Sequence, residues 1–163
     1  MSTDASKPSY PRFEVGDPAP QFSLANQDGE QVSSTKFSGK KLIAYFFPAA
    51  STPGCTLEAI DFNNSYEDFK KAGYELIGIA PDPIEKLKHF KSSQKLKFEL
   101  LSDEDKAAHK AFGAYGDKSL YGRLYRGVLR STFVIDESGK FIQALYSVKA
   151  TGHVSMLRRK LGI

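Results

Sequence analysis

Residues 41–56 read KLIAYFFPAASTPGCT and place the only cysteine of the chain, Cys55, where a predicted strand becomes a predicted helix. Six of the first seven residues are apolar or aromatic, which is typical of a buried strand. Pro48 ends this strand because it has no backbone N–H to donate to a neighbour. Thr52 is a favourable N-cap residue and Pro53 suits the first helical position, so we expect a helix to begin there.

A thiol in the first turn of a helix lies near unpaired backbone N–H groups and the positive end of the helix dipole. Both favour the thiolate, which is the nucleophilic form of cysteine. A lone cysteine is more often a small buried hydrophobe. A cysteine in an apolar core, however, needs no capped helix start, no adjacent proline and no glycine such as Gly54 to keep the turn open. The residues alone leave the reactive and the structural interpretations of Cys55 equally open.

This stretch resembles the motif of a known family. Pro48-x-x-x-Thr52-x-x-Cys55 reproduces the motif of the peroxiredoxins, and TPGCT followed by Glu58-Ala59 resembles their bacterioferritin-comigratory protein (BCP)/PrxQ subgroup. Two later segments, 112–118 and 127–136, are also similar to that subgroup, so the resemblance runs from about residue 13 to the C-terminus. It implies a single-cysteine (1-Cys) peroxiredoxin. Such an enzyme is a thiol-dependent peroxidase that reduces hydrogen peroxide and organic hydroperoxides through a sulfenic acid at Cys55, without a metal or cofactor.

The resemblance also implies roles for further residues. Arg130 begins a predicted strand and matches the arginine of the family's second motif. In that role it would stabilise the Cys55 thiolate and bind the peroxide oxygens. The alternative is an arginine that only forms a salt bridge at the surface. The Thr52 hydroxyl would orient the peroxide, and Pro48 would shield the thiolate from water. Glu58 lies about one turn after Cys55 and is expected to hold Arg130, the alternative being an exposed helix glutamate.

The chain departs from the subgroup at position 60. Many members carry a resolving cysteine five residues after the peroxidatic one, and this chain has Ile60 there. Oxidised Cys55 must therefore be reduced by an external thiol, which would be thioredoxin, a glutaredoxin-type protein or a low-molecular-weight thiol. The resemblance favours a monomer or weak homodimer. The sequence leaves open whether Ile60 is natural or replaces a resolving cysteine.

Composition and length favour one compact unit. A chain of 163 residues with 40% hydrophobic residues can bury one core, so we expect a single domain over residues 13–163 after a flexible tail over residues 1–12. The longest apolar run is far shorter than the ~20 residues that cross a bilayer. The first residues have neither an apolar nor a basic targeting segment, and a cytoplasmic protein is expected.

Other classes of site find little support. One cysteine excludes an internal disulfide and a four-cysteine metal site. We expect His89, His109 and His153 to be surface or half-buried side chains. The net charge of +4 is spread along the chain, and its one dense basic patch, 86–97, is interpreted as the solvated face of a helix. No nucleic-acid partner is expected, and acidic-partner binding is a minority alternative.

The order of predicted elements indicates an α/β fold. Segments on either side of Asn26–Gly29 predict an N-terminal β-hairpin. Further strands are expected at 42–47, 74–80, 98–101, 130–135 and 141–146, the last two as an antiparallel hairpin. Helices are expected at 53–71, 84–93, 106–112 and 151–160, with Asp82-Pro83 and Ser102 or Asp103 as caps, and a glycine-punctuated loop at 113–127. This order implies a mixed central sheet flanked by helices, as in the thioredoxin-like fold of peroxiredoxins.

Three rival functions remain open at this stage. A glutathione-peroxidase-like enzyme would share the fold and the thiol, but that family relies on a tryptophan, and this chain has none. A thioredoxin-type disulfide reductase needs Cys-x-x-Cys, which the sequence lacks. A non-enzymatic thioredoxin-fold interaction or holdase module would not depend on Cys55.

Overall fold

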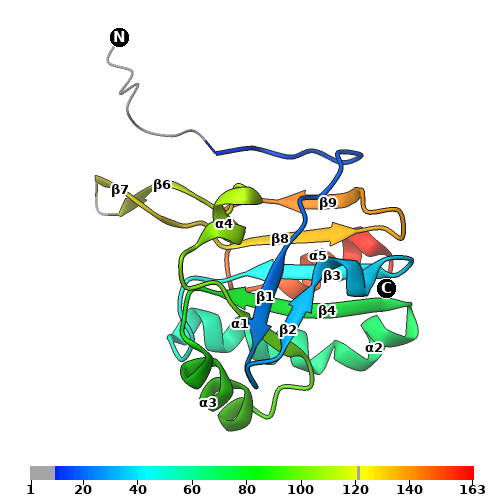
Figure 1. Cartoon of the computed structure of the whole chain (residues 1–163). Helices are drawn as coiled ribbons and strands as arrows, with labels where there is room; N and C mark the ends of the chain where they lie inside the picture. Colours follow the sequence, from blue (N-terminus) through cyan, green and yellow to red (C-terminus); the bar gives the residue numbers. More distant parts are fainter. Residues whose placement is uncertain (1–9, 121) are drawn as a thin grey trace.

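The strand that precedes Pro48 lies at the centre of the fold. β3 (Lys41–Phe46) pairs in parallel with β4 (Tyr74–Ala80) and antiparallel with β8 (Ser131–Ile135) in the computed structural model, which describes residues 10–120 and 122–163. These strands belong to a seven-stranded sheet with the order β2-β1-β5-β4-β3-β8-β9 (Figure 1). A strand with neighbours on both sides and helices over its faces is buried throughout, which explains the apolar run that begins at Leu42.

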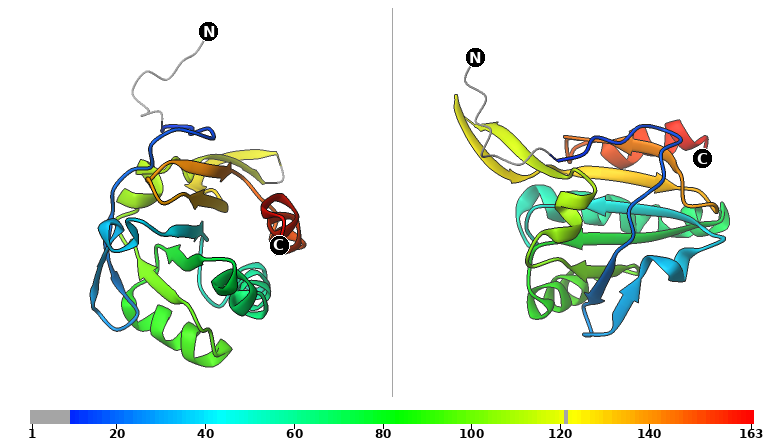
Figure 2. Two further views of the ribbon diagram at one scale, coloured as in Figure 1. Left: turned by 90° about the vertical axis from the view of Figure 1, so that its right-hand side faces the viewer. Right: turned by 45° about the horizontal axis from the view of Figure 1, so that its top comes forward.

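The remaining elements surround this sheet (Figures 1 and 2). The other strands of the sheet are β1 (Ser23–Asn26), β2 (Gln31–Ser33), β5 (Glu99–Ser102) and β9 (Phe141–Leu145), while β6 (Tyr115–Leu120) and β7 (Arg123–Val128) form a separate two-stranded sheet. The helices are α1 (Pro53–Asn64), α2 (Tyr66–Lys71), α3 (Ile84–Gln94), α4 (Ala107–Ala111) and α5 (His153–Leu161), with a 3-10 turn η1 (Ser34–Phe37). Within the described part of the chain, no helix is long and apolar enough to span a membrane.

The two faces of β3 divide the core into two clusters. Ile43 and Tyr45 pack with residues of α1, α2, α3 and α5, whereas Leu42, Ala44 and Phe46 pack with residues of α4 and the N-terminal segment. This division follows from the two-residue period of a strand, which turns successive side chains to opposite faces. Both clusters are rich in aromatic rings. The sheet therefore holds α1, and Cys55 with it, at a fixed position relative to β3.

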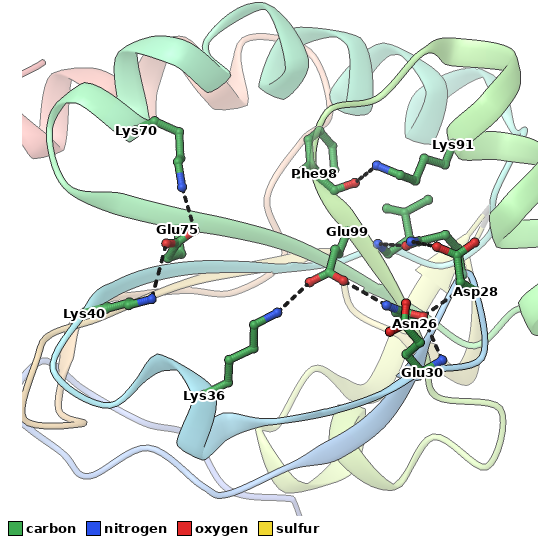
Figure 3. A network of polar contacts seen from close by, with 12 residues as sticks. Asn26, Asp28, Glu30, Lys36, Lys40, Lys70, Glu75, Lys91, Phe98 and Glu99 are labelled. Atoms are coloured by element: carbon green, nitrogen blue, oxygen red, sulfur yellow. Dashed lines mark hydrogen bonds and ion pairs between the residues drawn. The ribbon is translucent and has the colours of Figure 1, made fainter.

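The structure confirms the predicted α/β class and most of its elements. β1 and β2 form the expected N-terminal hairpin, and β8 and β9 the expected antiparallel pair. Asn26 explains the first turn, because its carboxamide oxygen accepts from the N–H groups of Asp28 and Glu30 (2.9 and 3.0 Å). Its amide also donates to Glu99 of β5 (2.8 Å), which ties the hairpin to the sheet (Figure 3).

Surface ion pairs lie at the amino-terminal ends of β4 and β5. Figure 3 shows Lys36 against Glu99 (3.4 Å) and Lys70 against Glu75 (3.0 Å). Exposed pairs of this kind contribute about 0–1 kcal/mol each. These ion pairs therefore contribute little to stability, and the packing of the two core clusters determines the fold.

The predicted helix over 53–71 is wrong as one element. α1 ends at Asn64 and α2 begins at Tyr66, because Ser65 adopts φ −98° and ψ 0° and interrupts the regular geometry. The Ser65 hydroxyl accepts from Arg158 of α5 (3.1 Å), a contact far away in sequence. The apolar stripe still points inward, since Phe62 and Phe69 are both buried.

The predicted loop over 113–127 is also wrong, because most of it is the β6–β7 hairpin. The glycines lie across from each other, with Gly116 opposite Gly127. Glycine and charged residues have low strand propensity, which hid the pairing from a sequence pattern. Gly122 supplies the positive φ (76°) in the turn. The hairpin projects from the main sheet (Figures 1 and 2).

Most of the predicted tail lies outside the described residues, which begin at residue 10. Tyr10 packs edge-on against Tyr115 at the base of the hairpin, and the Arg12 guanidinium lies over the Tyr146 ring at 4.3 Å. The division into a tail and a domain stays a prediction.

Two of the three histidine predictions are wrong and one is confirmed. His89 is exposed, whereas His109 and His153 are buried. His109 Nδ1 lies 2.6 Å from the carboxylate of Asp103, which also accepts from the first N–H groups of α4. Burial raises the pKa of Asp103, but the bonds from His109 and Ala108 outweigh it and hold that pKa below its ordinary value. The predicted N-cap at Ser102 or Asp103 is wrong, because Lys106 holds the N-cap position of α4. Asp103 still accepts from the N–H groups of Ala108 and His109, and this buried partner explains the buried histidine.

The packing of α1 on β3 should dominate stability. Phe62 is fully buried and stacks on Tyr45 with ring centroids 4.3 Å apart. We predict that Phe62→Ala lowers the free energy of unfolding by about 3–5 kcal/mol, because it removes a large side chain from a packed core. Leu124→Ala is the control, since Leu124 is 78% exposed and its truncation should cost less than about 0.5 kcal/mol. Urea unfolding measures both, and similar losses in the two variants would contradict the prediction.

Candidate active site

The loop after β3 has a strained backbone at the entrance to α1. Ser51 has φ 64°, a left-handed conformation that non-glycine residues rarely adopt. Thr52 follows in an extended conformation and holds the N-cap position, with Pro53 as the first helical residue, as predicted. The predicted capping bond is wrong, because the Thr52 hydroxyl donates to the Ala49 carbonyl (2.8 Å) instead. Thr52 therefore fixes the loop more than the helix.

Asp82 anchors this loop from the neighbouring strand. Its carboxylate accepts from the N–H of Ala50, and its own carbonyl accepts from the Ser102 hydroxyl at 2.7 Å. Of the predicted cap Asp82-Pro83, Pro83 holds the N-cap position of α3, whereas the Asp82 carboxylate bonds to the loop instead. Since β3 and β4 are parallel and adjacent, the residues that follow them meet at one sheet edge. That topology was the available signal for this contact.

Cys55 lies in the first turn of α1 and is 1% exposed. Nη2 of Arg130 approaches its Sγ to 3.4 Å. A buried thiolate needs a compensating cation, and the guanidinium together with the helix start supplies positive potential at the sulfur. The geometry thus places a cation against the sulfur.

The other side of the same guanidinium contacts a buried carboxylate. Nη1 of Arg130 lies 2.6 Å from Oε1 of Glu58, whose side chain is fully buried. Burial raises the pKa of Glu58 to about 7, although Arg130 acts in the opposite direction. Burial lowers the pKa of Arg130, but Glu58 and Cys55 together hold it above its ordinary value. The guanidinium is a cation shared by two buried acidic groups.

Gly54 leaves room for that guanidinium. A Cβ atom at position 54 would lie 3.3 Å from Nη2 of Arg130 and 3.7 Å from Cβ of Ala150. The first distance is tighter than ordinary packing, so a side chain there would press on the group that contacts the sulfur. A glycine directly before the cysteine is thus explained by close approach.

Buried polar groups extend the site inward. Nε2 of His153 lies 2.7 Å from Oγ1 of Thr132, and burial together with Arg130 lowers the pKa of His153 to about 4. Its imidazole is therefore neutral at physiological pH. Oε2 of Glu58 and the hydroxyl of Tyr45 are also buried, and each has no hydrogen-bond partner within residues 10–120 and 122–163. No local sequence pattern predicts the contact of His153 or the burial of these two unpartnered groups, because all three depend on tertiary packing.

Pro48 and Arg130 open onto a cavity of about 370 Å³. The opposite wall of this cavity comes from the β6–β7 hairpin. The structure thus brings five of the predicted residues together. Gly54, Cys55 and Glu58 lie against the Arg130 guanidinium, and Arg130 and Pro48 line the same cavity. Thr52 lies exposed three residues before the cysteine.

Known proteins share this sequence and fold. Residues 15–144 match the AhpC/TSA family. The chain is 52% identical over 152 residues to a putative peroxiredoxin of Mycobacterium tuberculosis (strain H37Rv), covering 93% of this chain and 97% of that protein. It is 44% identical over 141 residues to peroxiredoxin Bcp of Escherichia coli K12, covering 86% and 90%.

A solved structure agrees with these relatives. The bacterioferritin comigratory protein of Xanthomonas campestris superposes with a TM-score of 0.81 at 35% identity, covering 86% of this chain and 90% of that one. The predicted thioredoxin-like fold is thereby confirmed.

Glu58 should leave a signature in the pH dependence of stability. Its pKa rises from 4.5 to about 7 on folding, so the native state binds more protons than the unfolded state between these values. The Glu58 contribution is thus complete below pH 4.5 and is lost as pH rises through 7, by up to about 3 kcal/mol. His153 acts with the opposite sign, since its lowered pKa makes stability rise from pH 4 to 6.5.

We therefore predict a pH-dependent difference between Glu58→Gln and the wild type. The free energy of unfolding of the variant minus that of the wild type should increase as pH rises from 4.5 to 7, whatever constant offset the loss of the Arg130 contact adds. Urea unfolding at several pH values measures it, and Glu67→Gln, at an exposed position, is the control. A difference that stays flat over this range would contradict the buried, proton-binding state of Glu58.

Proposed function

Since this chain belongs to the AhpC/TSA family and is a peroxiredoxin, a thiol-dependent peroxidase, we propose that Cys55 and Arg130 form the centre of its active site. The contact of 3.4 Å between Sγ and Nη2 is the observation that carries the assignment. The family match favours peroxide reduction over the glutathione-peroxidase-like and non-enzymatic alternatives. The substrate is a peroxide and the reductant a thiol.

The reaction follows from the thiolate. The sulfur of Cys55 attacks the terminal oxygen of the hydroperoxide, an S–O bond forms, and the O–O bond breaks. The electron pair of the O–O bond stays on the second oxygen, which takes a proton from water and departs as water or an alcohol. The sulfur is oxidised to sulfenic acid and the peroxide is reduced. No other redox group takes part in this step.

Arg130 stabilises negative charge on both the attacking sulfur and the departing oxygen. Negative charge moves from the sulfur to the departing oxygen, and a fixed guanidinium stabilises that charge throughout the transfer. The bond to Glu58 holds the planar group in its orientation, so Glu58 acts as a positioning residue. Gly54 contributes by leaving the space that the guanidinium occupies.

Thr52 and Pro48 complete the proposal. The Thr52 hydroxyl donates its hydrogen to the Ala49 carbonyl. Its oxygen can therefore accept a hydrogen bond from the O–H of the incoming hydroperoxide. Pro48 has no N–H and presents an apolar ring at the cavity beside Arg130, which limits the access of water to the thiolate. Both roles agree with the predicted site residues.

Recycling of the oxidised cysteine requires a second thiol. The sequence has one cysteine, so that thiol comes from another molecule. Thioredoxin, a glutaredoxin-type protein and a low-molecular-weight thiol stay as the candidates. A monomeric or weakly dimeric state, a cytoplasmic location and the absence of a nucleic-acid partner also stay predictions.

Loss of the thiol provides the direct test of the function. We predict that the wild type consumes hydrogen peroxide in the presence of dithiothreitol and that Cys55→Ser does not, because serine is not ionised and is a weak nucleophile. Wild-type protein treated with peroxide alone should gain one oxygen atom in intact-mass spectrometry. Turnover by a folded Cys55→Ser protein would refute the proposed function.

Thr52 separates peroxide binding from stability. We predict that Thr52→Val lowers the rate of Cys55 oxidation by about 10-fold or more, since it removes a hydrogen bond made to the reacting peroxide. Thermal stability should fall by only about 1 kcal/mol, because the variant loses the bond to the Ala49 carbonyl but no capping bond of α1, and rates are compared per folded protein. Thr52→Ser should keep most of the rate. Equal oxidation rates for the valine and serine variants would return Thr52 to a purely structural role.

A further inference from the structure

The cavity beside the active site is shaped by a second element. It lies between the active-site loop and the β6–β7 hairpin, with a volume of about 370 Å³. Its lining residues are Pro48, Asp117, Lys118, Ser119, Leu129, Arg130, Ser147 and Val148. Because Arg130 contacts both the cavity and Sγ, a molecule in the cavity is one side chain away from the sulfur. This places the cavity where the organic part of a hydroperoxide would lie.

The charges in the cavity are not balanced. Arg130 already contacts Glu58 (2.6 Å) and Sγ of Cys55 (3.4 Å), and Asp117 is held in an ion pair with Arg126 (3.1 Å). Lys118, by contrast, makes no ion pair with any residue of the described chain. Of the three charged residues that line the cavity, Lys118 thus has no anionic partner among the residues that the structure describes.

The hairpin holds the Lys118 side chain in place. Lys118 lies opposite Tyr125, and its Nζ is 5.7 Å from the centre of the Tyr125 ring. Its Cδ passes 3.4 Å from the position that a Cβ of Gly127 would take. Gly127 therefore gives the aliphatic stem a path across the hairpin, and the ring flanks the charged end. A lysine guided in this way is better ordered than one on an open surface, so it loses less entropy on binding an anion.

Building on the proposed function, we propose that the cavity binds the organic part of a hydroperoxide that carries a carboxylate, with Lys118 as the residue that recognises the carboxylate. Arg130 receives the peroxide end, and apolar contacts come from Pro48, Leu129 and Val148. The carboxylate supplies the anion that Lys118 lacks. It is not altered by the reaction, in which sulfur is oxidised and the peroxide becomes the alcohol.

The size of the cavity limits which hydroperoxides it can hold. Ligand pockets generally measure about 300–1,000 Å³, and this one lies near the lower limit. It suits a compact acid better than a long acyl chain. The neutral peroxides, which lack a group for Lys118, would react without this contribution. Lys118 is thus a specificity-determining residue.

An acid and its ester provide a matched test. The probes are 4-(2-hydroperoxypropan-2-yl)benzoic acid and its methyl ester, which differ in charge but share the hydroperoxide. Each is mixed with reduced protein in the absence of a thiol, and the second-order rate constant of Cys55 oxidation is followed by rapid quenching and intact-mass spectrometry. The readout is the ratio of the acid rate constant to the ester rate constant.

We expect a wild-type ratio of about 10, the size of one charge-assisted hydrogen bond. Lys118→Met should bring the ratio close to 1, Lys118→Glu should favour the ester, and Lys118→Arg should retain the preference for the acid. Arg123→Met is the control, since Arg123 is an exposed cation of the same hairpin outside the cavity lining and its loss should leave the ratio unchanged.

The outcomes separate this inference from the proposed function. If the wild type reacts with hydrogen peroxide but treats the acid and the ester alike, the carboxylate site is refuted and the peroxidase assignment stands. A preference for the acid that survives in Lys118→Met, or that falls equally in Arg123→Met, would assign it to the general positive charge of the protein and overturn the role of Lys118. Failure to react with hydrogen peroxide at all would refute the proposed function itself.

Discussion

The site depends on one guanidinium shared by two buried acidic groups. Arg130 contacts Sγ of Cys55 through one nitrogen and the carboxylate of Glu58 through the other. A planar fork with several fixed donors can do this, whereas the single ammonium of lysine cannot reach both partners with the same geometry. Either acidic group would be costly to bury as an anion alone. The shared cation makes the pair tolerable, and the raised pKa of Glu58, about 7, reports how much of the burial cost remains.

Sheet topology brings these groups to one edge. β3 and β4 run in parallel, so the loop after β3 and Asp82 after β4 meet at their carboxyl ends. β8 runs antiparallel to β3, with Ser131 opposite Phe46, and this register puts the residue before Ser131 beside the end of β3. That residue is Arg130. A one-residue slip in the pairing would turn every side chain of β8 to the other face and would remove the guanidinium from the sulfur.

Sequence patterns predicted the elements with strong local signals and missed those defined by distant contacts. The apolar run before Pro48 and the proline-glycine helix start near Cys55 were sufficient for the central strand and for the start of α1, whereas the reactive role of Cys55 was predicted only with the family resemblance. The loop predicted in place of the β6–β7 hairpin shows the limit, because its glycines pair across strands and carry no apolar alternation. His153 was expected near the surface, and only its partner Thr132 on β8 explains its burial. The bond from Ala50 to the Asp82 carboxylate is a distant contact of the same kind.

Burial of Cys55 limits the access of a reducing thiol to the oxidised sulfur, and the contact with Arg130 bears on this access. Cys55 is 1% exposed and the chain has no second cysteine, so an external thiol can reach the oxidised sulfur only when the start of α1 moves. Oxidation itself favours that movement. A sulfenic acid is neutral, so the charge attraction between the sulfur and Arg130 is lost once the peroxide has reacted. The strained backbone of Ser51 is then free to relax. Glu58, one turn further along α1, contacts the same guanidinium, so Arg130 ties the first two turns of the helix to one group.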